Sequence, residues 1–187
     1  MGGDISKMST VSNIMNIYIS RIKDNIINSN SQNVSKLFDE LENEIKKIEH
    51  CEYEIVQYFE EGLVSGNWED EWYWTSVVIA KPSSVYLDIF FKIIETNNKS
   101  YPHWRILDVL AFMPEDLNLI ITKGIEKAIQ LNNPAWGEDE LKKAFEVLIW
   151  IGEDEAIEFI EQQCKSKEIR IAKMAEYWID WLNDEYD

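Results

Sequence analysis

The chain has 187 residues, enough for one domain with a sizeable core, and 45% of them are hydrophobic, which excludes a disordered protein. Only seven Gly and four Pro are present, which argues against an all-β fold with its many turns. The net charge of −17 makes nucleic acid and anionic membranes poor partners, because proteins bind phosphates and anionic lipids through Lys and Arg side chains. A basic protein partner fits this charge; the alternative is that the acidity only keeps the protein in solution.

The cysteines and the N-terminus bear on the compartment. Cys51 and Cys164 lie far apart and form no CxxC motif, so we expect unpaired thiols in a reducing compartment. The start of the chain, MGGDISKMST, lacks the basic residues and apolar core of a signal peptide. No apolar run is long enough to span a bilayer. These features predict a cytoplasmic protein.

The first third of the chain is predicted to form three helices. Apolar residues recur at spacings of three and four over residues 9–27, over 34–48, and again from residue 51 to a stop at 62–66. The polar segment NSNSQN, residues 28–33, separates the first two helices, because its side chains compete for backbone hydrogen bonds. We expect residues 1–66 to form the N-terminal part of a single domain that spans 1–187.

Residues 67–187 show a different pattern, in which two helices are separated by a break of a few residues. Pro or Gly ends the first helix, and Ser or Asp precedes the second. The predicted helices are 72–80 and 85–94, 104–113 and 117–129, 141–151 and 156–163, and a last helix over 169–182.

These helix pairs can be aligned with one another. A shift of 32 residues places Trp72 on Trp104 and Pro82 on Pro114, and a shift of 38 places Pro114 on Gly152. The pattern resembles HEAT-like α–α repeats, which implies an all-α fold of antiparallel helix pairs stacked as a short superhelix. An irregular helical bundle is the alternative, because the period varies between 32 and 38.

No motif for catalysis or metal binding is present. The two histidines, His50 and His103, belong to no Glu-x-x-His or HExxH motif, and no Walker A or GxSxG sequence occurs. Arg105 could bind an anion, but we expect it to pair with a neighbouring carboxylate. The pattern nearest to a magnesium site, interpreted as an exposed acidic face, is Glu158, Glu161, Glu176 and Asp180. We expect no catalytic residue, no cofactor and no metal.

The acidic residues are unevenly distributed. Residues 48–80 contain no Lys or Arg and eight carboxylates, among them Glu69, Asp70 and Glu71, and residues 144–164 also lack a base. In stacked helix pairs the second helices begin along one edge. This predicts a shared acidic rim formed by Glu115, Asp116, Glu153, Asp154 and Glu155.

The tryptophans are assigned by their helical positions. Trp72, Trp150 and Trp178 align with apolar neighbours and are predicted to lie in the core. Trp68 precedes the apolar stripe and Trp136 lies in a linker, so we expect both at the surface; the alternative for Trp136 is a linker residue folded back as a plug. The predicted partner-binding residues are Trp68, Glu69, Asp70, Glu71, Glu115, Asp116, Trp136, Glu153, Asp154 and Glu155.

Three functions are compatible with these features. Small, acidic, all-helical bacterial proteins without catalytic residues resemble the immunity proteins of polymorphic and contact-dependent toxin systems. That resemblance implies a non-catalytic protein that neutralises a cognate toxin, such as a nuclease, by covering its basic surface. The alternatives are a helical-repeat scaffold that binds a peptide or helix in its groove, and a metal-dependent helical enzyme.

Overall fold

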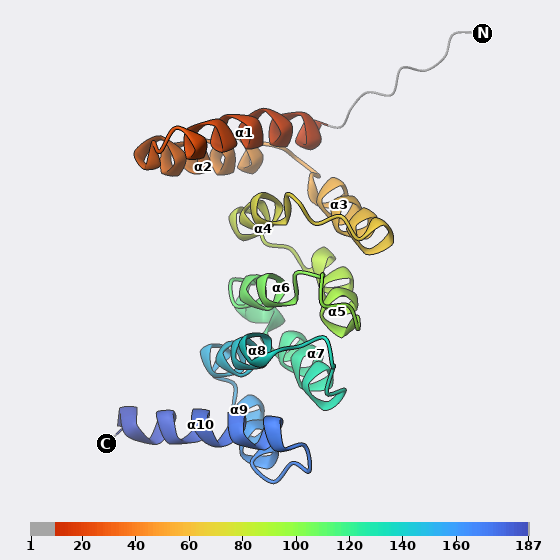
Figure 1. The fold of residues 1–187 in the computed structure, drawn as a ribbon, viewed down its shortest axis with the longest axis vertical. Helices are drawn as coiled ribbons and strands as arrows, with labels where there is room; N and C mark the ends of the chain where they lie inside the picture. The colour runs from red at the N-terminus through yellow and green to blue at the C-terminus, as the bar shows by residue number, and fades with distance from the viewer. Residues whose placement is uncertain (1–9, 187) are drawn as a thin grey trace, which may run out of the picture. The chain divides into compact units, whose positions relative to one another are not determined.

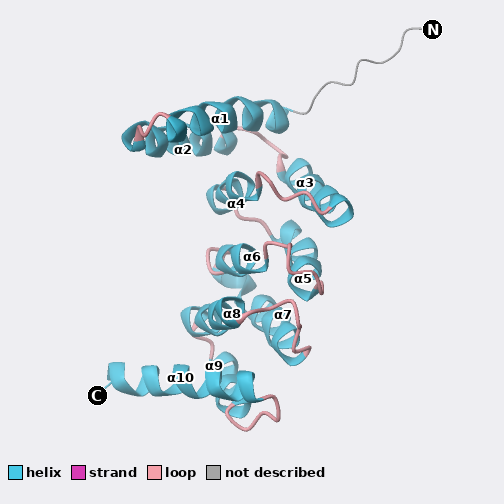
Figure 2. Ribbon diagram, in the orientation of Figure 1, coloured by secondary structure: helices cyan, strands magenta, loops and turns pink. Residues whose placement is uncertain are grey.

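The computed structural model describes residues 10–186, and these residues form an all-α fold of packed helices. They contain ten α-helices, two short 3₁₀-helices and no strand (Figures 1 and 2). The predicted all-α fold is confirmed. The first helix was expected from Ser9, which lies outside the described residues, and α1 is described from Thr10.

Within the described residues the chain divides into two compact units, residues 10–81 (unit 1) and 82–186 (unit 2). The division expected after residue 66 therefore does not coincide with the observed one, because α4 belongs to the first unit. The single domain and the HEAT-like repeat both stay predictions. Cys51 is buried in unit 1 and Cys164 half-buried in unit 2, and neither forms a disulfide. No helix of the described residues is long and apolar enough to cross a membrane.

Unit 1 contains four helices: α1 (Thr10–Ile27), α2 (Ser31–Lys46), α3 (Glu52–Ser65) and α4 (Glu71–Ala80). Helix α1 lies along α2, and both pack against α4. The fully buried side chains of this unit include Met15, Ile22, Leu41, Ile45, Ile55 and Phe59. Helix α2 begins three residues earlier than predicted, because Asn30 caps it by accepting a hydrogen bond from the Asn33 backbone N–H.

Unit 2 contains six α-helices in two layers. They are α5 (Leu87–Glu95), α6 (His103–Leu110), α7 (Asn118–Gln130), α8 (Glu138–Ile151), α9 (Asp154–Gln163) and α10 (Ile169–Tyr186). The 3₁₀-helices η1 (Ser84–Tyr86) and η2 (Glu115–Leu117) precede α5 and α7. Helix α7 packs on α5 and α9, whereas α8 packs on α6 and α10, and contacts between the two sets close the core.

The C-terminal end of α5 is held by side chains from later in the chain. The Ile94 carbonyl accepts hydrogen bonds from Trp136 Nε1 at 2.9 Å and from Asn133 Nδ2 at 3.2 Å. The Thr96 carbonyl lies 2.9 Å from His103 Nε2 and 3.0 Å from Asn133 Nδ2. These bonds satisfy carbonyls that a helix end would otherwise leave without a partner. They explain why the linker between α7 and α8 folds back onto the C-terminal end of α5.

We expect unit 2 to lose stability below neutral pH because of His103. The side chain is 2% exposed, and this burial lowers the pKa of His103 despite its hydrogen bond to Thr96. The unfolded chain then binds the proton more tightly, so the stabilising contribution of neutral His103 is complete above about pH 6.5 and decreases below it. Urea denaturation from pH 8 to pH 5 should show an extra loss of up to about 1.4 kcal/mol per pH unit, compared with His103→Gln. Equal pH slopes for both proteins would contradict this prediction.

Candidate functional site

Two tryptophans that were expected at the surface are buried. Trp68 is 8% exposed and follows α3, and its indole ring packs against that helix so closely that an added Cβ at Gly62 would lie 2.5 Å from it. Trp136 is 2% exposed, and its indole N–H binds the Ile94 carbonyl. The surface position predicted for both residues is therefore wrong, because each fills a space in its own unit. Trp136 takes the alternative role of a linker plug.

Two tryptophans that were assigned to the core are exposed instead. Trp72 is 51% and Trp150 is 65% exposed, whereas Trp178 is 6% exposed, as predicted. Helix α4 has apolar residues on more than one side, and Tyr73, Trp74, Thr75, Val77 and Val78 take the buried positions. Trp150 follows the buried Leu148 by two residues, a rotation of about 200° around the helix axis, which places the indole on the outer side.

The exposed Trp150 borders a hollow in unit 2 with a volume of about 800 Å³. Two turns form it: the one that joins α6 to η2 and α7, and the one that joins α8 to α9. Both turns are defined by local sequence. Pro114 precedes η2, and Gly152 ends α8 with a φ of +69°, a left-handed conformation that favours glycine. The lining residues are Ala111, Phe112, Met113, Glu115, Asp116, Asn118, Trp150, Ile151 and Glu153.

The hollow brings together three of the carboxylates predicted to share a rim. Glu115 and Asp116 are exposed, and the half-buried Glu153 accepts a hydrogen bond from Asn118 Nδ2 at 3.4 Å. No basic side chain of residues 10–186 forms an ion pair with these three carboxylates. The hollow is therefore acidic and lacks a counter-charge of its own.

The remaining rim residues, Asp154 and Glu155, have a different position. They form the first turn of α9, are exposed, and do not line the hollow. Negative charge at a helix N-terminus is favourable, because it interacts with the helix dipole. The interaction with the dipole of α9 therefore accounts for the position of these two carboxylates.

The apolar lining of the hollow includes, besides Ala111, Met113 and Ile151, two aromatic side chains that sequence reasoning missed. Phe112 is 48% exposed and lies in the turn after α6, and Trp150 lies near the end of α8. Trp150 could have been found from its spacing of two from Leu148, which leaves it off the buried stripe. Phe112 could not, because the turn starts two residues before the predicted helix end at residue 113.

The acidic segment of unit 1 is partly neutralised by distant lysines. Lys23 Nζ on α1 lies 2.9 Å from Asp70 Oδ1 and 3.2 Å from Glu69 Oε1, and these interactions raise the pKa of Lys23. Lys81 pairs with Glu52 at 3.6 Å. Residues 48–80 contain no Lys or Arg, but in the fold these two lysines offset part of the negative charge of the segment. Glu71 is half-buried in the first turn of α4.

A network of ion pairs joins α6 to α8. Arg105 lies 3.5 Å from Asp108, and Lys143 Nζ lies 3.1 Å from Asp108 and 2.8 Å from Glu146. Burial would lower the pKa of Lys143, but its bonds to Glu146 and Asp108 outweigh this and raise it. The prediction that Arg105 pairs with a neighbouring carboxylate is confirmed.

Neither a metal site nor a known relative points to a function. Within residues 10–186, no group of three or more His, Cys, Asp or Glu side chains is arranged to hold a metal ion. Comparison of the chain with family models, curated proteins and solved structures finds no match.

Proposed function

We propose that the protein is a non-catalytic binding module whose acidic hollow receives a basic side chain of a protein partner. The observation that carries this proposal is the hollow itself, which places three carboxylates without an ion pair beside two exposed aromatic rings. The partner that fits the resemblance is a toxin domain, such as a nuclease. The protein would then act in the cytoplasm as an immunity protein.

The chemistry of the hollow suits Arg or Lys. A cation over the face of Trp150 or Phe112 is attracted by the ring, and this attraction strengthens when the complex excludes water. Glu115, Asp116 and Glu153 supply the opposite charge, and a guanidinium can bind a carboxylate with two parallel hydrogen bonds. Occupation of the hollow would cover the basic surface that a nuclease uses to hold phosphate.

The long-range charge should act mainly on the association rate. A net charge of −17 steers a basic partner toward the protein, and salt screens this attraction over about 8–10 Å. Association should therefore slow steeply as salt increases. A helical-repeat scaffold with an apolar groove would show little salt dependence, so a salt series separates the two functions.

The test is co-expression and binding with the protein encoded by the adjacent reading frame. If this neighbour is toxic, co-expression should restore growth. Trp150→Ala should weaken binding about 30-fold, the loss typical of an interface hot spot. Neutralising the hollow with Glu115→Gln, Asp116→Asn and Glu153→Gln should reduce the association rate and its salt dependence.

A matched control removes the same charge elsewhere on unit 2. Glu158→Gln, Glu161→Gln and Glu176→Gln change three exposed carboxylates that do not line the hollow. This triple variant should bind far better than the hollow variant. Equal losses would show that only net charge matters. A neighbour that is not toxic, or that does not bind at moderate salt, would overturn the immunity function.

A further inference from the structure

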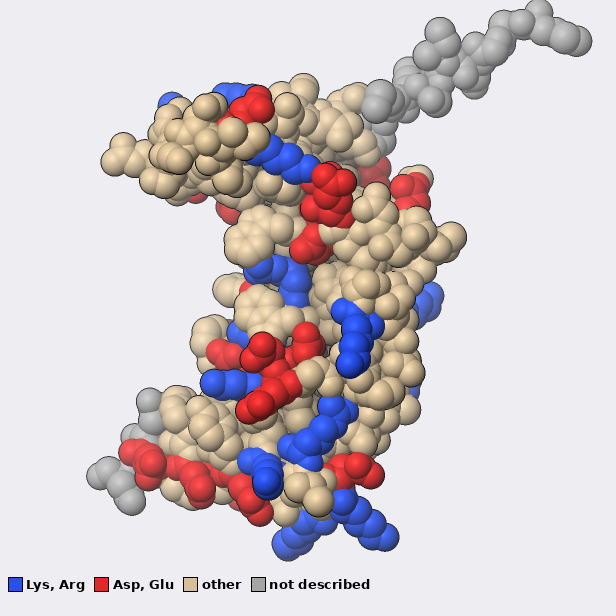
Figure 3. All heavy atoms as spheres, viewed as in Figure 1, with Lys and Arg blue, Asp and Glu red and all other residues tan. Residues whose placement is uncertain are grey.

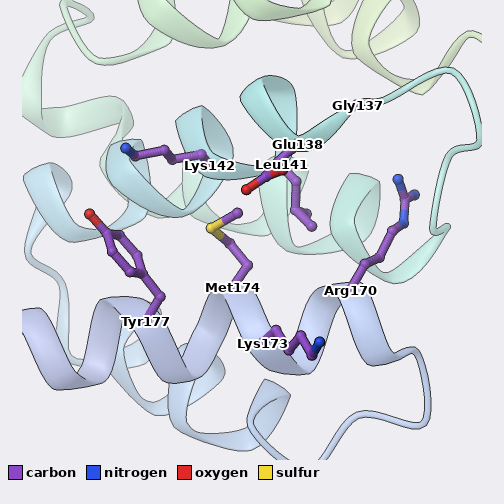
Figure 4. Close-up of a pocket in the computed structure, with 8 residues that line it drawn as sticks. All are labelled: Gly137, Glu138, Leu141, Lys142, Arg170, Lys173, Met174 and Tyr177. Atoms are coloured by element: carbon purple, nitrogen blue, oxygen red, sulfur yellow. The ribbon is translucent and has the colours of Figure 1, made fainter.

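A second cavity in unit 2 has the opposite charge character. It lies between α8 and α10 and has a volume of about 520 Å³, within the range of ligand sites in proteins. Leu141, Met174 and Tyr177 provide its apolar surface, and Lys142, Lys173 and Arg170 provide basic groups (Figure 4). Glu138 also lines the cavity, as does Gly137.

The basic groups lie at the two ends of the apolar surface. Lys142 and Tyr177 are at one end, where Lys142 Nζ lies 5.5 Å from the centre of the tyrosine ring. Lys173 and Arg170 are at the other end. The α10 residues at positions 170, 173, 174 and 177 share one face of the helix, over a length of about 10 Å.

The two lysines at these ends have no carboxylate partner. Neither Lys142 nor Lys173 forms an ion pair with a described residue, whereas Lys143, one position further along α8, binds two carboxylates. Figure 3 shows basic side chains around the start of α10 and acidic side chains along the rest of it. In a protein of net charge −17, this leaves a local positive site.

Arg170 is held in place by the loop before α8. Its Nε donates to Asn132 Oδ1 at 2.7 Å, and its two terminal nitrogens donate to the Trp136 and Asn133 carbonyls at 2.6 and 2.9 Å. A guanidinium has five N–H groups, so two remain for a ligand. The basic end of the cavity is therefore preorganised.

We propose that this cavity binds a short acidic peptide segment of a protein partner, in which two apolar residues lie between two carboxylates. The carboxylates would meet Lys142 and Lys173, and the apolar side chains would pack on Leu141, Met174 and Tyr177. Glu138 would accept a hydrogen bond from a backbone N–H of the peptide. A small single carboxylate fits less well, because Glu138 would repel it in the middle of the cavity.

The test is an NMR titration of the full chain, labelled with ¹⁵N, using the peptide acetyl-GELLEG-amide. Saturable shifts are expected at amides of α8 and α10 that border the cavity. The peptide acetyl-GQLLQG-amide, with the same shape and no charge, should bind about tenfold more weakly. No saturable shift up to a few millimolar, shifts at other surfaces, or equal binding of the two peptides would overturn the proposal.

Protein variants test the same contacts. Lys142→Gln with Lys173→Gln should weaken binding of the acidic peptide about tenfold. Lys165→Gln with Lys167→Gln is the matched control, because these exposed lysines do not line the cavity. Equal effects of the two pairs would contradict the site. None of these residues lines the acidic hollow, so a negative result here would not contradict the proposed function, which has a separate test.

Discussion

Trp136→Ala is expected to lower the free energy of unfolding by about 3–5 kcal/mol, the usual cost of removing a buried large aromatic side chain. The side chain is 2% exposed and closes the end of α5 through its bond to the Ile94 carbonyl. Truncation leaves a cavity and removes one donor from that carbonyl. Urea denaturation of the full chain, followed by circular dichroism at 222 nm, measures the change.

Trp136→Phe is the control that separates volume from hydrogen bonding. It keeps most of the ring but loses the indole N–H, and Asn133 Nδ2 still donates to the Ile94 carbonyl at 3.2 Å. We expect a loss of about 1 kcal/mol, the typical net contribution of one hydrogen bond, together with some loss of packing. If Trp136→Ala leaves stability unchanged but abolishes partner binding, Trp136 is a surface residue and its assignment as a plug is wrong.

Gly124→Ala should destabilise unit 2 by about 1–3 kcal/mol, although Gly→Ala within a helix normally stabilises by about 0.5–1 kcal/mol. The sign reverses because a Cβ at position 124 would lie 2.2 Å from Cε1 of Phe91. Residue 124 lies in α7 and Phe91 in α5, two helices that pack together. The ring would have to move out of its place between them.

A double-mutant cycle tests whether Phe91 is the cause. Leucine at position 91 is smaller than phenylalanine and should leave room for the new methyl group. Introduced into Phe91→Leu, Gly124→Ala should be neutral or slightly stabilising, as expected for a helix interior. The same loss in both backgrounds would show that Phe91 does not restrict residue 124. Thermal denaturation and urea denaturation should agree on the sign.

The helices could be predicted because their signals are local. The predicted stop at 62–66 agrees with Gly66, which ends α3 with a φ of +71°, and Gly152 ends α8 in the same conformation. The start of α2 was misplaced by three residues, since Asn30 caps the helix and 31–33 join it. An Asn-rich segment contains several possible caps, and the hydrogen bond from the Asn33 backbone N–H to Asn30 Oδ1 shows which one is used.

The candidate site could be predicted only in part. The proximity of Glu115 and Asp116 to Glu153 followed from the two-helix pattern and is found in the hollow. The exposed positions of Phe112 and Trp150 beside these carboxylates could not be predicted from the two-helix pattern. The direction of a side chain on an apolar helix, or in a linker, depends on which neighbour offers space. Gly62 offers that space to Trp68, and the end of α5 offers it to Trp136.

The sequence by itself determined that this protein is helical, approximately where its helices begin and end, and that its charge is strongly negative. These properties depend on the spacing of residues and on counts. Only the tertiary structure decided which tryptophans are exposed, which carboxylates have a lysine partner, and where acidic and basic cavities lie. Lys23 illustrates the reason: it is 46 residues from Glu69 in the chain, yet lies 3.2 Å from it in the fold.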